Sequence, residues 1–446
     1  MEIANRVRAI RGDYHYAWSI VGIGTALRVT ANFVSQAFGV VLVVLQDNFF
    51  QWDADFQWKV TAVVLAQVFR SLASGAMSPV AAWLGDRYGV RRSLLVAATL
   101  YVVGMLLLST ISHVWQLYLY YSFILGGAQA IFSVNIPTTV AAWFKKRLGV
   151  AVGVQQSLGG MGGAITAPAL ALLIRLAGWQ VAFWIIAAVG GVIIFALLSR
   201  FHGEPADRGM RAYGAAEDDP PPRSSGDSAS HKLRTRVFLQ QVRRTTSFWN
   251  LIAIHHLGCV GHSIVLVHVV FYATTLGIGL SAASWIIFGY TLSSMASRFA
   301  TPILADHFGS KGVMALAYTL QGVTVLCLFW VQEPWHFYLF SALFGIGFGG
   351  EMSAFLVINR QYYGMGPVRS VFGFQHLGSG LGMGMGGLLG ALIFDSLGSY
   401  DWAWVISIAA SLAGTLCIVF LQPTSRLLIP EWEESLPAEA EAAPAT

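Results

Sequence analysis

The strongest constraint on the fold of this chain is a series of long apolar runs separated by short polar connections. An α-helix needs about 20 apolar residues to cross the ~30 Å hydrocarbon core of a bilayer, and the runs reach that length. Backbone groups in lipid need partners within the chain, which leaves only helices or closed barrels. Barrel strands would be about ten residues long and alternate in polarity. The runs therefore predict transmembrane helices.

Composition supports a chain that faces lipid over most of its surface. Of its 446 residues, 56% are hydrophobic and only 11% are charged, and the mean hydropathy is +0.62. A soluble domain carries roughly 25% charged residues. Three arginines precede the first run, but that run is longer than a signal-peptide core and has no cleavage-type ending, so we expect it to be retained as a span.

The apolar runs predict an all-α membrane protein with two bundles of six helices. We expect spans near 17–45, 58–83, 93–112, 117–140, 148–174, 180–200, 248–275, 281–303, 313–331, 337–359, 368–394 and 402–421. The predicted domains are therefore an N-terminal bundle at 1–200, a cytoplasmic linker at 201–247, a C-terminal bundle at 248–421 and a disordered acidic tail at 422–446.

Charge placement predicts the topology. Lys and Arg concentrate in alternate connections, which the positive-inside rule assigns to the cytoplasm, whereas the other connections carry mainly acids. Both termini and the linker are therefore expected in the cytoplasm, and a bacterial inner membrane is the expected location. The end of the linker, 232–244, is basic with interspersed apolar residues. It is either an amphipathic helix on the anionic inner leaflet or a simple basic flank.

Charged residues at the ends of the predicted spans, Lys59, Arg200 and Arg369, are counted with the connections. Four charged residues then remain well inside the spans: Arg28, Arg70, Arg298 and Glu351. A charge at the bilayer centre costs at least a few kcal/mol if it faces lipid, so each should face the protein interior or a water-filled cavity. Three cations against one acid favour an anionic ligand, because the arginine fork matches a carboxylate.

Arg28 begins a polar stripe with Asn32 and Gln36 at helical spacing, and it lies twelve residues after Tyr16. At about 1.5 Å per residue that places it near the middle of the bilayer. We therefore expect Arg28, Asn32 and Gln36 to bind substrate, with an interhelical structural pair as the alternative for Arg28. For Arg70 the alternatives are a functional role and a buried pair with Glu351 or with backbone carbonyls.

The predicted spans also contain groups that could carry a proton. His255 and His262 are seven residues apart on one face of the seventh span, and Glu351 follows a glycine-rich stretch. Histidine titrates near neutral pH, so these three are candidates for proton coupling. A buried neutral histidine, or an acid that only neutralises an arginine, is the alternative. No compact set of Cys, His and acid is expected, so no metal is predicted.

Two related charged turns lie half a chain apart. Residues 84–92 read LGDRYGVRR and residues 304–311 read LADHFGSK, so Asp86 and Asp306 are separated by 220 residues in a chain of 446. The same turn at the same membrane edge indicates two related bundles, as in transporters built from repeats. The expected gating residues are Asp86, Arg87, Arg91, Arg92 and Asp306.

With twelve spans and this turn, the chain resembles the major facilitator superfamily over nearly its whole length. The family motif between spans two and three is Gly-x-Leu-x-Asp-Arg-x-Gly-Arg-Lys/Arg, and here Ala82 replaces its first glycine. The resemblance implies alternating access between two bundles. It also implies that Asp86 braces the inner gate in the outward-facing state.

Within that family the chain is similar to the monocarboxylate-porter and oxalate–formate-antiporter branch. The supporting segments are WFKKRLGVAVG at 143–153, GWQVAF at 178–183 and FDSLGSY at 394–400. The resemblance implies that Arg298, in the eighth span, binds substrate. The acid that the branch places one turn earlier is Ser294 here. Gln375 and His376 are the polar groups near the position of an eleventh-span lysine, and we expect them to bind substrate as well.

Together these features predict a secondary active transporter of a small organic anion, coupled to protons or working by exchange. Its partners would be that anion, a proton and membrane lipids, with no cofactor, no enzymatic step and no nucleic acid, and we expect a monomer. The alternative within transport is an aromatic or neutral compound, for which the 15 Trp and 28 Phe could line a cavity. A membrane sensor would need a sizeable soluble domain, which the sequence does not offer.

Overall fold

Helices make up nearly all of the part of the chain that the computed structural model describes, residues 15–33, 60–217, 219 and 229–437. The first half contains six membrane segments. They are α2 (Ala17–Ala31), α5 (Val60–Tyr88), α6 (Val90–Leu108), the continuous run of α7 (Val114–Leu117), the π-helical η1 (Tyr118–Ile124) and α8 (Leu125–Ala142), then α9 (Leu148–Ala177) and α10 (Trp179–Ser199). The span predicted at 17–45 is described only as far as residue 33.

The second half repeats the six-segment pattern. It comprises α12 (Thr246–Thr275), α13 (Leu280–Phe308), α14 (Ser310–Val325) with η3 (Leu326–Phe329), α15 (Pro334–Ser353) with α16 (Phe355–Tyr363), α17 (Arg369–Leu397) and α18 (Asp401–Val419). Among the described residues, eight segments are long and apolar enough to cross a membrane. With α2, α5, α9 and α13 they complete the predicted twelve, so the predicted fold is confirmed.

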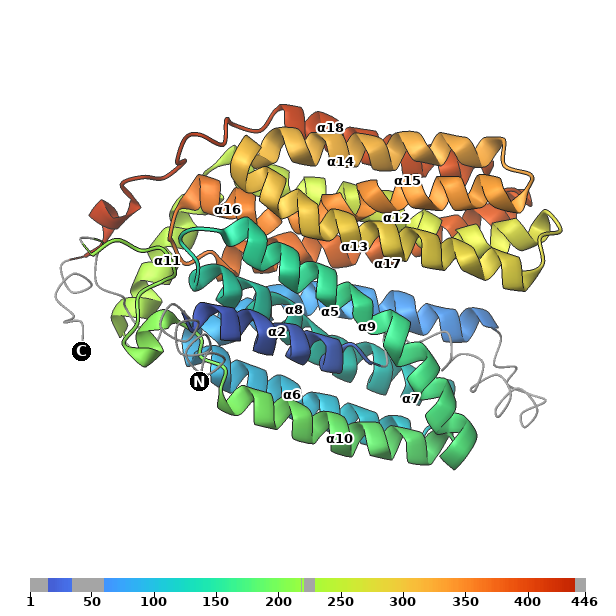
Figure 1. Ribbon diagram of the computed structural model, residues 1–446, viewed down its shortest axis with the longest axis horizontal. Helices are drawn as coiled ribbons and strands as arrows, with labels where there is room; N and C mark the ends of the chain where they lie inside the picture. Colours follow the sequence, from blue (N-terminus) through green and yellow to red (C-terminus); the bar gives the residue numbers. More distant parts are fainter. Residues whose placement is uncertain (1–14, 34–59, 218, 220–228, 438–446) are drawn as a thin grey trace, which may run out of the picture.

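The two halves form two layers of roughly parallel helices (Figure 1). The layers meet along two seams, in which α5 packs along α17 and α9 packs along α13. At the first seam the backbones touch: a Cβ added to Gly75 would lie 2.7 Å from the Cα of Gly380. Small residues allow this close approach, as at other helix interfaces in membranes.

The tail is more ordered than its acidic composition predicts, and the linker also contains helices. The linker contains η2 (Pro205–Arg208) and α11 (Ala229–Arg243). The apolar face of α11 packs on protein, since Phe238 is fully buried and its ring lies 5.0 Å from that of Trp432. The tail between 422 and 437 includes η4 (Trp432–Ser435). The expectation of disorder is therefore wrong for 422–437, because Trp432 and Leu436 supply apolar side chains to bury; residues 438–446 lie outside the described chain.

Candidate functional site

Two arginines from opposite halves lie near each other. Arg28 lies on α2 of the first half and Arg298 on α13 of the second, both half-buried. Their guanidinium groups are close enough for the two positive charges to interact. Arg28 also donates a hydrogen bond to the side-chain oxygen of Gln156 on α9. A bound anion could reduce the repulsion between like charges held in a medium of low dielectric constant.

Arg298 is held by an aromatic ring. Its Cζ lies 4.9 Å from the ring centroid of Phe348 on α15, a cation–π contact. Within the described residues, no hydrogen-bond acceptor or ion-pair partner meets its guanidinium group, and its buried Nε has no partner. The charge of Glu351 is near enough to act on it. Arg298 therefore keeps its hydrogen-bonding capacity for a ligand.

Glu351 and His262 form a buried pair inside the second half. The Nδ1 atom of His262 lies 2.8 Å from Oε2 of Glu351, and both side chains are fully buried. The other carboxylate oxygen, Oε1, has no hydrogen-bond partner in the described chain. Ligand atoms of Cys259, His262 and Glu351 all lie within 4.8 Å of one another. The expectation that no compact set of Cys, His and acid exists was therefore wrong, because α12 and α15 bring together residues that are distant in sequence.

His255 and His376 form a second aromatic group beside this pair. Their ring centroids are 6.2 Å apart, and His255 stacks on Phe355 at 4.1 Å. Neither ring nitrogen of the buried His255 makes a well-formed hydrogen bond, although the backbone of Gln375 is near. The charge of Arg28 reaches His376 across the interface between the halves. The structure thus brings Arg28, Arg298 and His376 together.

The remaining predicted substrate ligands lie in different settings. Asn32, the C-cap residue of α2, is buried four residues after Arg28, whereas Gln36 falls outside the described residues. The fully buried Gln375 exchanges two hydrogen bonds with Asn359, of 2.8 and 2.9 Å. Both ends of its amide are therefore occupied, and in this conformation Gln375 is closed to a substrate.

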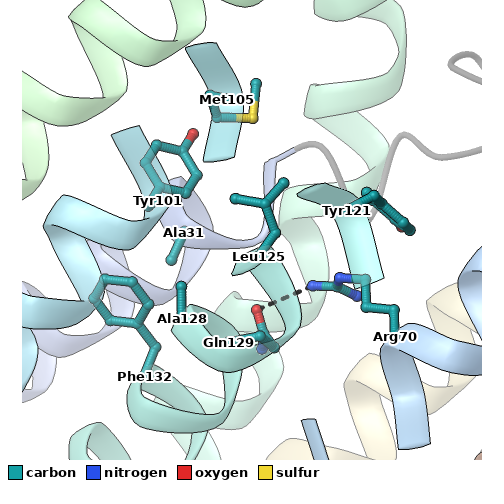
Figure 2. Close-up of a pocket in the computed structure, with 9 residues that line it drawn as sticks. All are labelled: Ala31, Arg70, Tyr101, Met105, Tyr121, Leu125, Ala128, Gln129 and Phe132. Atoms are coloured by element: carbon teal, nitrogen blue, oxygen red, sulfur yellow. Dashed lines mark hydrogen bonds between the residues drawn. The ribbon is translucent and has the colours of Figure 1, made fainter. Parts of the chain in front are cut away.

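Arg70 lies inside the first half, away from Glu351. It donates a hydrogen bond of 3.3 Å to Gln129, and its Cζ lies 5.2 Å from the ring centroid of Tyr121. Figure 2 shows these side chains around a small pocket between α5, α6, η1 and α8. The accessible space is about 10 Å³, near the minimum for one water molecule. The suggested pairing of Arg70 with Glu351 is not formed.

The first charged turn closes one seam on its predicted cytoplasmic side. Asp86 accepts a hydrogen bond of 2.7 Å from Arg369 and one of 2.6 Å from Ser370, both at the start of α17. Gly85 permits this approach, since a Cβ there would lie 2.8 Å from Cδ of Arg369. A carboxylate at a helix N-terminus also gains from the helix dipole.

The second charged turn closes the other seam. The carboxylate of Asp306 accepts a hydrogen bond of 3.2 Å from the backbone N–H of Gly149, at the start of α9. Arg360 of α16 donates to the backbone carbonyl of Ala141 at the end of α8. The predicted gating residues Arg87, Arg91 and Arg92 are exposed instead, and Arg87 lies over the rings of Trp83 and Tyr88.

Sequence reasoning missed several residues of this arrangement: Gln156, Phe348, Asn359, Arg360 and Arg369. The last two were counted only as positive charges marking the cytoplasmic side. Arg369 begins α17, and its pairing with Asp86 spans 283 residues of sequence, so no local pattern reveals it. Gln156 could have been found, because a polar pair, Gln155–Gln156, interrupts an otherwise apolar helix.

Comparison with known proteins identifies the family. The model of the Major Facilitator Superfamily matches residues 21–283 and 257–442, nearly the whole chain. Monocarboxylate transporter 13 of Bos taurus is 24% identical over 429 residues, which cover 94% of each chain. Monocarboxylate transporter 11 of Homo sapiens is 23% identical and covers 92% of this chain and 83% of its own. The MFS-type transporter pynF of Aspergillus niger is 24% identical over 74% of this chain and 75% of its own.

Solved structures share the fold. The proton:xylose symporter XylE matches with a TM-score of 0.73 at 14% identity, covering 95% of this chain and 99% of that one. The transporter FucP, solved in its outward conformation, matches with a TM-score of 0.64 at 13% identity, covering 90% and 99%. The three curated relatives come from mammals and a fungus, so they give no support to the expected bacterial inner membrane. They do support a multi-pass membrane protein.

Proposed function

Because the chain belongs to the major facilitator superfamily, we propose that it is a secondary active transporter that moves a small carboxylate by alternating access. The two bundles rock about a central site, with no chemical step and no cofactor. Several relatives bear the name monocarboxylate transporter, which favours this class of anion. The active unit is a single chain embedded in membrane lipids.

One observation supports an anionic substrate above the others. Arg28 and Arg298 come from different halves, are half-buried, and interact as like charges. A carboxylate bound between them satisfies both guanidinium groups with charge-assisted hydrogen bonds. It also links the halves, so binding would favour the state in which both arginines reach it. Asn32 and His376 lie close enough in the chain and the fold to complete this site.

The His262–Glu351 pair is the best candidate for the coupling proton. It is fully buried in the second half, and a proton can reside on either partner. Glu351 also acts on Arg298 through its charge, which connects the protonation of the pair to the arginine that binds substrate. His255, with no well-formed hydrogen bond at either ring nitrogen, is a further relay candidate.

The contacts of Asp86, Asp306 and Arg360 support an assignment of this conformation. All three cross between the halves at the ends of the helices that the positive-inside rule assigns to the cytoplasm. The cytoplasmic gate is therefore closed, and the central site communicates with the opposite side. Both termini and the segment between α10 and α12 lie in the cytoplasm in this assignment.

Uptake into proteoliposomes tests the proposal. Radiolabelled pyruvate, L-lactate, succinate and benzoate are compared with neutral lactamide and benzamide for the wild type, Arg28→Ala and Arg298→Ala. Uptake of at least one carboxylate, lost in both variants, is the expected result. Arg175→Ala is the matched control, since Arg175 is exposed at the end of α9, and it should transport like the wild type.

Two results would change the assignment. Unchanged carboxylate uptake in Arg28→Ala would remove Arg28 from the site. Saturable uptake of the neutral amides alone would favour the alternative, an aromatic or neutral substrate. Coupling is examined by an imposed pH gradient, which should drive uptake in the wild type and have no effect in Glu351→Gln, while that variant still exchanges labelled for unlabelled substrate.

A further inference from the structure

Phe348 contacts Arg298 on one side and His262, the hydrogen-bonding partner of Glu351, on the other. Its ring centroid lies 4.9 Å from Cζ of Arg298 and 4.8 Å from the ring of His262. His262 in turn lies 2.8 Å from the Glu351 carboxylate. A chain of contacts thus runs from Arg298 through Phe348 and His262 to Glu351. The side chain of Phe348 is only 8% exposed, so its place in this chain is fixed by packing.

Arg298 and Glu351 have strong reasons to pair directly. Their opposite charges interact, and the protein interior screens that attraction far less than water does. Arginine prefers a bidentate carboxylate partner, and one oxygen of Glu351 has no partner in the described chain. Nevertheless, no ion pair joins them in this part of the structure. A direct pair would occupy the fork that the proposed function assigns to the substrate.

We propose that Phe348 is a positioning residue that keeps Arg298 from closing onto Glu351 and so reserves its guanidinium group for the substrate carboxylate. The inference rests on the proposed function. The face of an aromatic ring suits this role, because it attracts a cation without supplying a hydrogen-bond acceptor that would compete with the substrate.

His262 holds the other end. Phe348 and Glu351 are three residues apart on α15, so they are neighbours on the surface of one helix. His262 of α12 engages the Glu351 carboxylate, and Tyr318 of α14 is a further polar neighbour of that acid. Arg298 therefore stays against the ring of Phe348, while Glu351 stays bonded to the ring of His262. The substrate carboxylate then binds an arginine that Glu351 would otherwise neutralise.

Substrate binding to Phe348→Ala tests the inference. Thermal-shift titrations of purified full-length protein use pyruvate, L-lactate, succinate and benzoate, and the anion that stabilises the wild type most is carried to the variants. If Arg298 then pairs with Glu351 about nine-tenths of the time, the apparent Kd rises about tenfold. The double variant Phe348→Ala/Glu351→Gln removes the competing charge, so its Kd should return to within about threefold of Glu351→Gln alone.

Phe344 supplies the matched control. It lies one turn earlier on α15, is fully buried, and stacks on Phe348 at 6.2 Å without contacting Arg298. Phe344→Ala leaves a comparable cavity and should bind the anion like the wild type. Phe348→Leu keeps apolar bulk but lacks the ring face that attracts the guanidinium group, so its apparent Kd should also rise, and binding equal to the wild type would overturn the role of the aromatic ring. Phe348→Val serves the same test if the alanine variant does not purify.

The outcomes separate the two proposals. Binding by Phe348→Ala equal to that of Phe344→Ala, or no recovery in the double variant, would overturn the role of Phe348 alone. If no anion in the panel stabilises the wild type, or if Arg298→Ala binds as well as the wild type, the proposed function itself is overturned, and the inference about Phe348 with it. Those two results involve no change at Phe348, so they identify which proposal failed.

Discussion

Arg70 and Arg298 both lie in predicted membrane helices and over an aromatic ring, yet their remaining contacts differ. Arg70 lies 5.2 Å from the Tyr121 ring centroid and also donates to Gln129. Arg298 lies 4.9 Å from the Phe348 ring centroid, with no acceptor among the described residues. The first half gives its cation a partner within the same bundle, whereas the second leaves one open at the interface.

This difference shows why a charge inside a membrane span does not by itself mark a binding site. A buried guanidinium group must be compensated, and the compensation can come from the same bundle or from a ligand. Arg70 is partly compensated by Gln129 and Tyr121 before any ligand arrives, although its buried Nε has no partner either. The charge of Arg298 acts on Arg28 of the other half, and under the proposed function the substrate anion compensates both. The contrast can be tested by removing each arginine in turn.

The largest effect is expected for Arg298→Ala. Hydrogen bonds to a charged group contribute about 1.5–3 kcal/mol, so carboxylate uptake at low concentration should fall roughly 10- to 100-fold. The melting temperature should stay close to that of the wild type, because no acceptor in the described chain loses its donor. Initial rates in proteoliposomes and a thermal melt of the same preparation provide both numbers. If the melting temperature falls as far in Arg298→Ala as in Arg70→Met, the two arginines do not differ in their contribution to stability.

Arg70→Met should show the opposite pattern. It leaves Gln129 without its donor and removes the contact with Tyr121, which we expect to lower stability by about 2 kcal/mol. Uptake per folded molecule should stay within about twofold of the wild type, since no substrate contact is lost. Melting temperature and uptake normalised to folded protein are the measurements. A selective loss of uptake would place Arg70 in the site.

Asp86→Asn tests the contact in which Arg369 of the second half is neutralised by a carboxylate of the first half. The asparagine keeps a weaker bond to Arg369 and Ser370, so we expect the closed cytoplasmic gate to lose about 1 kcal/mol, or about fivefold in its population ratio. Hydrogen–deuterium exchange should increase in the first turns of α17. Asp306→Asn, on the other seam, is the companion variant. Unchanged exchange in α17 would show that the seam does not depend on this pair.

The smallest effect is expected for Lys145 and Asp219, outside the membrane. Lys145 donates hydrogen bonds of 2.5 and 2.6 Å to Asp219 and thereby holds the pKa of that carboxyl below its usual value. A carboxyl with a lowered folded-state pKa stabilises the fold above its unfolded pKa, near 3.9, and that contribution is lost as the pH falls further. Between pH 6 and 8 Asp219→Asn should therefore melt with a constant, barely measurable offset from the wild type.

The fold followed from the sequence because its determinants are local. Apolar length predicts a membrane helix, and a charged turn repeated after 220 residues predicts two bundles. The same approach located Arg28 and Arg298, since a cation inside an apolar run is conspicuous. Disorder from residue 422 was predicted from acidic composition and was wrong up to residue 437, because Trp432 finds its partner, Phe238, 194 positions earlier.

The partners of the site residues could not be predicted in the same way. Whether Arg70 meets Glu351 or Gln129 depends on how helices far apart in sequence pack. Gln375 looked like a ligand, yet the turn between α16 and α17 places Asn359 opposite its amide. Periodicity places a residue on one face of a helix, but it does not identify the helix that lies against that face.

The two contacts that arginines make at the predicted cytoplasmic ends of the seams differ in how they can change over generations. Arg369 reaches the carboxylate of Asp86, so a substitution at either position weakens or strengthens that closure. Arg360 reaches the backbone carbonyl of Ala141, which every amino acid possesses. A substitution at position 141 therefore leaves the acceptor in place, and only a substitution of Arg360 removes the hydrogen bond. A substitution at either Asp86 or Arg369 can therefore change the first contact, whereas only a substitution of Arg360 can remove the second.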